Sequence, residues 1–262
     1  MAISADSSAA LITGASSGIG YELTKLFARD GHDVVLVSRS EQELRAFGSE
    51  LEDRHGITAT VVPADLSEPG AARDVFDAVR SEGVDVHTLV NNAGFGVYGR
   101  FVETDLDTEL DLLRLKIMTV THLTKLYVTE MVDRGYGRIL NVASITGVAP
   151  VSTASVYSGT NHYLVGFSEA LAEDLADEDI TVTALCPGET NTSFMNHGNM
   201  EESAFTEDDL MDPATVAQAG YDGLRSGDRI VVPGIKNKIR MQLKRLVPRE
   251  SYVQLASDVW NE

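Results

Sequence analysis

Apolar and polar positions along the chain follow two alternating periods. Short apolar, β-branched runs recur near residues 9–13, 34–37, 58–62, 86–90, 138–142, 181–185 and 229–232. Runs that are apolar on both faces are typical of parallel strands covered on both sides. Stretches with helical spacing lie between them, near residues 19–29, 106–133 and 154–176, after Ser40 and after Asp212. This alternation predicts an α/β fold with a doubly wound parallel sheet of seven strands.

Helix starts are marked by capping residues. Ser40 with Glu43, and Thr104 with Asp107, have the spacing of a capping box. Asp212 precedes Pro213, which suits the first turn of a helix because its missing N–H would have no partner there. These signals predict three helix starts.

We expect one domain over residues 1–262, with two segments of distinct composition. Residues 189–211 are polar and acidic with scattered apolar side chains, which predicts either a mobile lid over a pocket or a solvated loop. The tail at 234–262 begins with basic residues interleaved with apolar ones, and no acid lies between 236 and 249. Its basic residues are Lys236, Lys238, Arg240, Lys244, Arg245 and Arg249. Such a helix can contact an anionic membrane surface, an acidic neighbouring subunit or its own domain.

The formal net charge of −19 limits the classes of partner. Binding nucleic acid calls for a basic surface, so this class is excluded. The excess of acids and the scarcity of lysine favour a salt-adapted protein, with an ordinary acidic enzyme as the alternative.

The single cysteine and the absence of long apolar runs point to the compartment. Cys186 cannot form an internal disulfide or a thiolate metal cluster, so we expect no metal and interpret it as a small buried hydrophobe. The first residues do not resemble an export signal, and no apolar run reaches the length that spans a bilayer. We therefore expect a soluble, cytoplasmic protein.

Polar and glycine-rich motifs follow the carboxyl ends of the predicted strands. The first strand leads into Thr13-Gly14-Ala15-Ser16-Ser17-Gly18-Ile19-Gly20, whose glycines let backbone N–H groups approach a pyrophosphate. Asn91-Asn92-Ala93-Gly94 follows the fourth strand, Ser144 the fifth and Pro187-Gly188 the sixth, with Tyr157 thirteen residues after Ser144. Open α/β sheets bind their ligands at this edge.

Taken together, these motifs resemble the short-chain dehydrogenase/reductase family over nearly the whole chain. The resemblance implies a Rossmann-like sheet that binds NAD or NADP, and a serine and a tyrosine that act on a carbonyl or alcohol. Ser144 matches that serine and Tyr157 that tyrosine. The resemblance to this family also implies a homodimer or homotetramer built through the two long helices.

The expected chemistry explains the residue types. Hydride transfer to a ketone leaves an alkoxide, and the phenol of Tyr157 can protonate it if a nearby cation lowers its pKa from about 10. The hydroxyl of Ser144 can polarise the substrate oxygen. A lone serine before Gly147 would otherwise be interpreted as a turn former, but its spacing to Tyr157 favours the catalytic role.

The chain departs from the family at two catalytic positions. The family has a lysine four residues after the tyrosine, where this chain has Asn161. It also has a catalytic asparagine in the preceding long helix, and Lys116 aligns with that position. We hypothesise that the two have exchanged roles, Lys116 supplying the cation and holding the ribose while Asn161 serves the proton relay. The alternative is that Lys116 is an exposed lysine on its helix and the protein a catalytically degenerate NADP-binding sensor or scaffold. His162 offers a weaker source of charge.

The resemblance also assigns the cofactor contacts. The second predicted strand ends in Ser38 and Arg39 and has no acid there, which favours NADP over NAD. The alternative is a surface arginine that pairs with Glu41 or Glu43. Asp65 has helix capping as its alternative role. The cofactor-binding residues implied are Gly14, Ser16, Ser17, Gly18, Ile19, Gly20, Ser38, Arg39, Asp65, Leu66, Asn92, Ala93, Gly94, Lys116, Tyr157, Pro187, Gly188, Thr190 and Thr192.

The predicted substrate pocket is mostly apolar. Residues 95–98, residues 148–151, Phe194 and Met195 are its candidate lining, with ordinary packing as the alternative role. None of these side chains is charged, so we expect a small or hydrophobic carbonyl compound as substrate.

Overall fold

The strands form one twisted parallel sheet. The computed structural model describes residues 9–192, 210–243, 248, 251–254 and 256–257. Within that part of the chain the seven strands have the order β3-β2-β1-β4-β5-β6-β7, and the ligand-binding crevice is expected beside β1 and β4, where the order reverses. Their bounds are β1 Ala9–Thr13, β2 Asp33–Ser38, β3 Ala59–Pro63, β4 Val86–Asn91, β5 Gly137–Val142, β6 Ile180–Leu185 and β7 Ile230–Val231. The predicted doubly wound sheet is confirmed.

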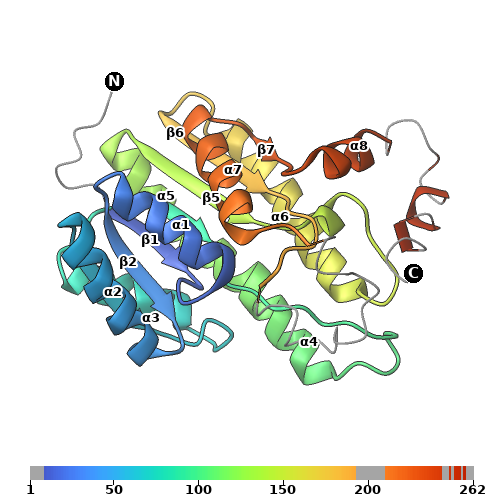
Figure 1. Ribbon diagram of the computed structural model, residues 1–262, viewed down its shortest axis with the longest axis horizontal. Coiled ribbons are helices and arrows are strands. Elements are labelled where there is room, and N and C mark those ends of the chain that lie inside the picture. The colour runs from blue at the N-terminus through green and yellow to red at the C-terminus, as the bar shows by residue number, and fades with distance from the viewer. Residues whose placement is uncertain (1–8, 193–209, 244–247, 249–250, 255, 258–262) are drawn as a thin grey trace.

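Helices cover both faces of the sheet (Figure 1). One face carries α1 (Gly18–Arg29), α2 (Glu41–His55) and α7 (Pro213–Ser226). The other carries α3 (Ala71–Ser81), α5 (Val120–Arg134) and α6 (Ser155–Asp174). The two buried clusters explain why the strand sequences are apolar on both sides.

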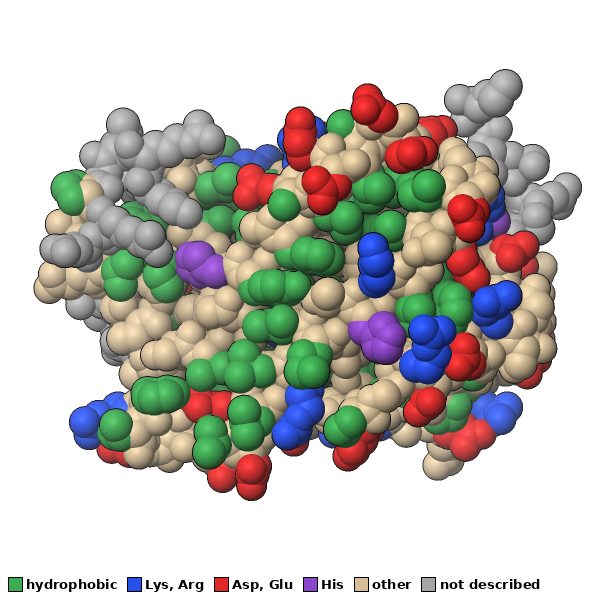
Figure 2. Space-filling model, turned by 180° about the vertical axis from the view of Figure 1, so that it is seen from behind, with side chains coloured by type: hydrophobic (Ala, Val, Ile, Leu, Met, Phe, Trp, Pro, Cys, Tyr) green, Lys and Arg blue, Asp and Glu red, His purple; other side chains and the backbone are tan. Residues whose placement is uncertain are grey.

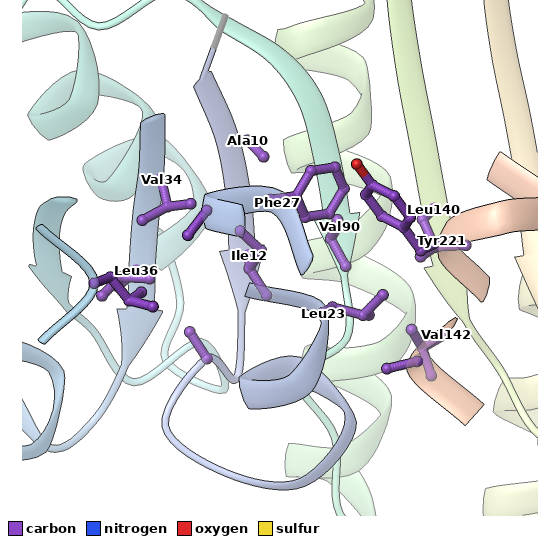
Figure 3. Packing of buried hydrophobic residues seen from close by; sticks show 14 of the residues in the cluster. Ala10, Ile12, Leu23, Phe27, Val34, Leu36, Val90, Leu140, Val142 and Tyr221 are labelled. Carbon is purple, nitrogen blue, oxygen red and sulfur yellow. The ribbon is translucent and has the colours of Figure 1, made fainter. Parts of the chain in front are cut away.

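The core under α1 illustrates this packing (Figure 3). Leu23 and Phe27 of α1 point toward Ile12 of β1 and are essentially buried. Tyr221 of α7 meets Phe27 edge-on, with ring centroids 4.9 Å apart. This interlocking fixes the start of α1, which carries the glycine-rich turn, against the end of β1.

Two of the three predicted helix starts are confirmed. The Ser40 hydroxyl accepts from the Glu43 amide at the start of α2, and the Asp212 carboxylate accepts from the Thr215 amide at the start of α7. The third is wrong: Asp105, not Thr104, caps α4 (Leu106–Leu113), accepting from the Thr108 amide and hydroxyl. A carboxylate is the stronger acceptor beside the positive end of the helix.

The predicted long helix near 106–133 contains a local change of pitch. Between α4 and α5, residues Arg114–Thr119 form a π-helical turn, η1. A π-helical turn shifts the register of the residues that follow, and such turns are frequent at functional sites. Lys116 lies within it.

The lid and the tail are described only in part. Residues 193–209, with Phe194 and Met195, lie outside the described residues. In the tail, α8 (Ile235–Leu243) exposes Ile235 and Ile239 together with Lys236 and Lys238. Lys244, Arg245 and Arg249 lie outside the described residues. Among the described helices, none combines the length and apolar character needed to cross a membrane.

Candidate active site

The carboxyl ends of the central strands open onto a cavity of about 350 Å³. Nearly all of the predicted catalytic and cofactor-binding residues line it; the two exceptions are Gly20 and Asn161. The fold thus brings together motifs that lie up to about 180 positions apart in the sequence, as expected where parallel strands end at one edge.

The glycine-rich turn between β1 and α1 has little room for side chains. Gly14 and Gly18 have φ of +67° and +56°, in the left-handed region that glycine adopts without strain. A Cβ at Gly18 would lie 3.0 Å from the Thr192 side chain, which packs beside the turn. At Gly20 it would lie 2.3 Å from the Gly14 oxygen, so Gly20 permits close packing behind the turn instead of lining the cavity.

Asn92 joins this turn to the end of β4. Its side chain donates to the backbone oxygens of Thr13 and Gly14, at 2.9 and 3.3 Å. The Thr13 hydroxyl accepts in return from the amides of Asn92 and Ala93. These bonds fix two of the sequence motifs relative to each other and hold the turn open for a diphosphate.

Ser144 and Tyr157 meet where β5 ends and α6 begins. Ser144 caps the short 3-10 helix η2 (Ile145–Gly147), and Tyr157 lies in the first turn of α6, 6% exposed. Burial raises the pKa of Tyr157 above 10.0; hydrogen bonds with the Ser144 and Asn161 side chains oppose this, and the charge of Glu189 adds to it. Burial dominates, so the predicted lowering of this pKa by a nearby cation is wrong for the described residues. The Tyr157 phenol still carries the proton that a general acid needs.

Lys116 is a buried cation in the wall of the same cavity. It is 4% exposed, and its Nζ donates to the Val142 oxygen at 3.4 Å and lies 5.5 Å from the centroid of the Tyr157 ring. The side chain runs along Gly94, where a Cβ would come within 3.5 Å of it. Burial lowers the pKa of Lys116 from 10.5 to about 8. The alternative of an exposed lysine on this helix is therefore wrong.

Asn161 lies beneath Tyr157, outside the cavity lining. Fully buried, it donates from Nδ2 to the Tyr157 backbone oxygen at 2.9 Å and to the Thr146 hydroxyl at 3.3 Å. Its Oδ1 has no hydrogen-bond partner among the described residues. His162 turns away, its Nδ1 2.9 Å from the Ser158 oxygen, and does not line the cavity.

Ser38, Arg39 and Asp65 form the opposite end of the cavity. Among the described residues Arg39 has no ion pair with Glu41 or Glu43, and Glu41 pairs with Arg45 instead. Asp65 accepts from the Ser67 amide and hydroxyl, while α3 is preceded by Gly70, so the helix-capping alternative for Asp65 is wrong. The Ser38 Oγ is buried without a partner in the described chain, available to a ligand.

The apolar part of the cavity surrounds Tyr157. Phe95 and Tyr98 line it, whereas Val151 packs into the cluster behind Tyr157 and residues 148–151 do not reach the cavity. Tyr98 folds over Gly96, where a Cβ would overlap its ring, and its ring centroid lies 5.8 Å from that of Tyr157. Ala256 of the tail joins this cluster, so part of the tail packs on its own domain.

Sequence reasoning missed one charged residue of the cavity. Glu189 follows Pro187-Gly188 at the end of β6, lines the cavity and has a side chain that is 10% exposed. An acid at the carboxyl end of a strand was the available signal, but the chain around it reads as a polar loop. Cys186, two positions before the glycine, is a buried hydrophobe as expected, and burial raises its pKa to about 12.

The chain matches a family model described as short chain dehydrogenase over residues 8–203. A Streptomyces coelicolor protein named "Putative ketoacyl reductase" is 37% identical over 189 residues, which are 71% of this chain and 72% of the relative. The very-long-chain 3-oxoacyl-CoA reductase of Anas platyrhynchos is 32% identical over 184 residues, covering 68% of this chain but 58% of the relative.

A solved structure agrees with these matches along most of the chain. It is a short-chain dehydrogenase from Sphingobium yanoikuyae in complex with NADPH. The similarity has a TM-score of 0.81 at 29% identity and covers 92% of this chain and 96% of that one. Fold and sequence thus point to the same family.

Proposed function

The chain belongs to the short-chain dehydrogenase family of oxidoreductases, and from this premise we propose that it is an NADP(H)-dependent enzyme interconverting a carbonyl and an alcohol. One observation carries the proposal: Ser144, Tyr157 and the buried ammonium of Lys116 line one cavity with the glycine-rich turn. A protein that only binds a nucleotide has no need to bury a lysine beside a phenol.

The residues present fit a dinucleotide. Positive φ at Gly14 and Gly18 opens the turn, and the unpartnered Ser38 hydroxyl and the Arg39 guanidinium lie at the other end. When bound, the nicotinamide supplies the hydride. Arg39 supports the preference for NADP, since a guanidinium can bind the additional phosphate and β2 does not end in an acid.

In the proposed reduction, Ser144 and Tyr157 act at the substrate oxygen. The Ser144 hydroxyl donates a hydrogen bond to the carbonyl oxygen and stabilises the negative charge that develops on it. Tyr157 then donates its phenolic proton to that oxygen, and the nearby Lys116 ammonium stabilises the phenolate that is left. In oxidation the same groups act in the reverse direction.

Lys116 takes the role of the family's usual lysine. Its ammonium lies over the face of the Tyr157 ring and against Gly94, where it can reach a ribose hydroxyl while stabilising a phenolate. Asn161 lies one turn after Tyr157 on α6 and donates hydrogen bonds to the Tyr157 backbone oxygen and to the Thr146 hydroxyl. We assign these two bonds to the proposed proton relay. The complementary placement of the two residues supports the exchange.

The proposed substrate is a small or hydrophobic carbonyl compound, because Phe95, Tyr98 and Ile145 line the cavity near Tyr157. Two relatives have names that include ketoacyl or oxoacyl reductase, which supports a ketone. We also propose a homodimer or homotetramer through the long helices, where Met118 is 65% exposed.

The test is NADPH oxidation with a panel of ketones and aldehydes, for the native protein, Tyr157→Phe and Tyr163→Phe. Tyr163 lies on the same helix, hydrogen-bonded to Thr121, and serves as the control. We expect turnover for the native protein and the control, and a loss of at least about 100-fold for Tyr157→Phe, because the proton donor is removed.

A second measurement separates an inactive binder from a misfolded protein. NADPH affinity of Tyr157→Phe, followed by cofactor fluorescence, is expected to stay within about threefold of the native value. Turnover that survives in Tyr157→Phe would reject the assigned role. Tight NADPH binding by the native protein without turnover of any compound would favour the sensor or scaffold.

A further inference from the structure

Glu189 is an acidic side chain of the cavity that the proposed mechanism does not use. It lies four positions after the last residue of β6, and its backbone oxygen accepts from the Met211 amide at 2.8 Å, which fixes its position. Its side chain is 10% exposed and lines the cavity together with Ser144 and Tyr157. The carboxylate is therefore held at the cavity wall by the sheet itself.

Among the described residues, the Glu189 carboxylate has one ion-pair contact, and it is a long one. Within the described residues its cationic partner is Arg240 of α8, whose Nη1 lies 3.7 Å from Oε2, beyond hydrogen-bonding distance. The Arg240 side chain is 38% exposed and mostly solvated. Burying a carboxylate costs free energy unless hydrogen-bond donors or a cation lie next to it. A ligand in the cavity can supply such a donor or cation.

Two aromatic rings face the same space. Tyr98 and Tyr157 lie 5.8 Å apart between ring centroids, and the negative charge of Glu189 acts on both phenols, raising the pKa of each. Tyr98 is held in this position because Gly96 leaves room for its ring. Aromatic faces beside a carboxylate form a site that suits an organic cation and disfavours an anion.

We propose that Glu189 determines substrate specificity and selects carbonyl compounds that carry a positively charged ammonium group. This inference rests on the proposed function. The carbonyl lies at Ser144 and Tyr157, and the ammonium lies between Glu189 and the ring of Tyr98. Substrates with a carboxylate near the carbonyl are disfavoured by repulsion.

The test uses a pair of methyl ketones of equal shape. One carries a trimethylammonium group separated from the carbonyl by three methylenes, and in the other a tert-butyl group replaces it. The proteins are the native chain, Glu189→Gln and Arg240→Met. Glu189→Gln removes the charge and keeps the shape; Arg240→Met removes the ion pair and keeps the carboxylate.

We expect the native protein to prefer the cationic ketone by about tenfold in kcat/KM, through KM, because one screened charge pair is at stake. Glu189→Gln should lose this preference, so that the ratio of kcat/KM for the cationic over the neutral ketone falls to about one. Arg240→Met should keep or increase the preference, since the carboxylate loses its competing partner. Equal losses for both ketones in Glu189→Gln would mean that Glu189 only anchors α8, and would overturn the inference.

Binding of the two corresponding alcohols, measured calorimetrically with NADPH present so that the alcohols cannot be oxidised, gives a readout that needs no turnover. Tighter binding of the cationic alcohol that disappears in Glu189→Gln supports the inference even if no ketone is reduced, in which case the proposed function alone has failed. Equal binding of both alcohols to the native protein overturns the inference. Reduction of the neutral ketone would then leave the proposed function standing.

Discussion

Lys116 shows how one side chain combines a cost in stability with a chemical use. Lys116 is 4% exposed, and among the described residues its ammonium has one hydrogen-bond acceptor, the Val142 oxygen. Burial lowers its pKa to about 8, whereas the unfolded chain has about 10.5. The folded protein therefore binds fewer protons than the unfolded chain between these values, and the buried charge destabilises the fold below them.

We predict that Lys116→Met increases the free energy of unfolding near neutral pH, on the order of 3 kcal/mol, because no charge is buried. The gain should shrink as pH rises from about 8 to 10.5, where the native lysine becomes neutral in the fold and the native protein catches up. Urea unfolding at both ends of this pH range measures the free energy of unfolding of each protein. Lys125→Met serves as the control, because Lys125 is exposed. A gain that does not depend on pH would contradict the buried charge.

At the scale of elements, two neighbouring helical segments carry the residues of the proposed exchange. The π-helical turn η1 carries Lys116, and α6 carries Tyr157 and Asn161. In a regular α-helix, successive side chains point in directions about 100° apart around the axis. The wider π-helical turn changes this angle locally. Lys116 thereby lines the cavity although its neighbour Ile117 does not.

We predict that Lys116→Asn and Asn161→Lys each lower kcat/KM, and that the double variant recovers at least about tenfold over Lys116→Asn. The double variant again contains one cation and one amide, with the cation now at position 161 and the amide at position 116. Steady-state kinetics of the four proteins gives the coupling. A double variant no better than the worse single variant would count against the exchange of roles.

The whole molecule combines a strong negative charge with an apolar region. The formal charge is −19, and acidic side chains lie mainly toward the edges of the face in Figure 2, while hydrophobic ones gather across its middle. Self-repulsion of this size destabilises the compact state in dilute buffer, and salt reduces it within a Debye length. This reasoning supports the proposal of a salt-adapted protein.

We predict that the melting temperature rises steadily as KCl increases from about 0.01 M to 1 M, because screening weakens the repulsion between acids. Differential scanning calorimetry measures the change, and an uncharged osmolyte at equal osmolality is the control for general exclusion from the surface. A melting temperature that is already maximal in dilute buffer would favour the ordinary acidic enzyme.

The predicted fold and much of the candidate site agree with the structure because both depend on local patterns. Strands that are apolar on both faces require a covered parallel sheet, and motifs at strand ends must meet at one edge. The sequence predicted Thr104 as a helix cap, but Asp105 caps α4. Adjacent polar residues can both serve as caps, and only the folded backbone decides which side chain is oriented toward the free amides. Glu189 was missed because burial, which makes it significant, depends on α8, distant in the sequence.

The sequence by itself determined the order of elements, the family and the residue types available for chemistry, since these follow from periodicity and motif spacing. Only the tertiary structure decided that Lys116 faces the cavity, that Asn161 lies beneath Tyr157, and that a carboxylate stands opposite two phenols. The physical reason is that burial, and with it the energy of a charge, is set by neighbours that folding brings together from distant parts of the chain.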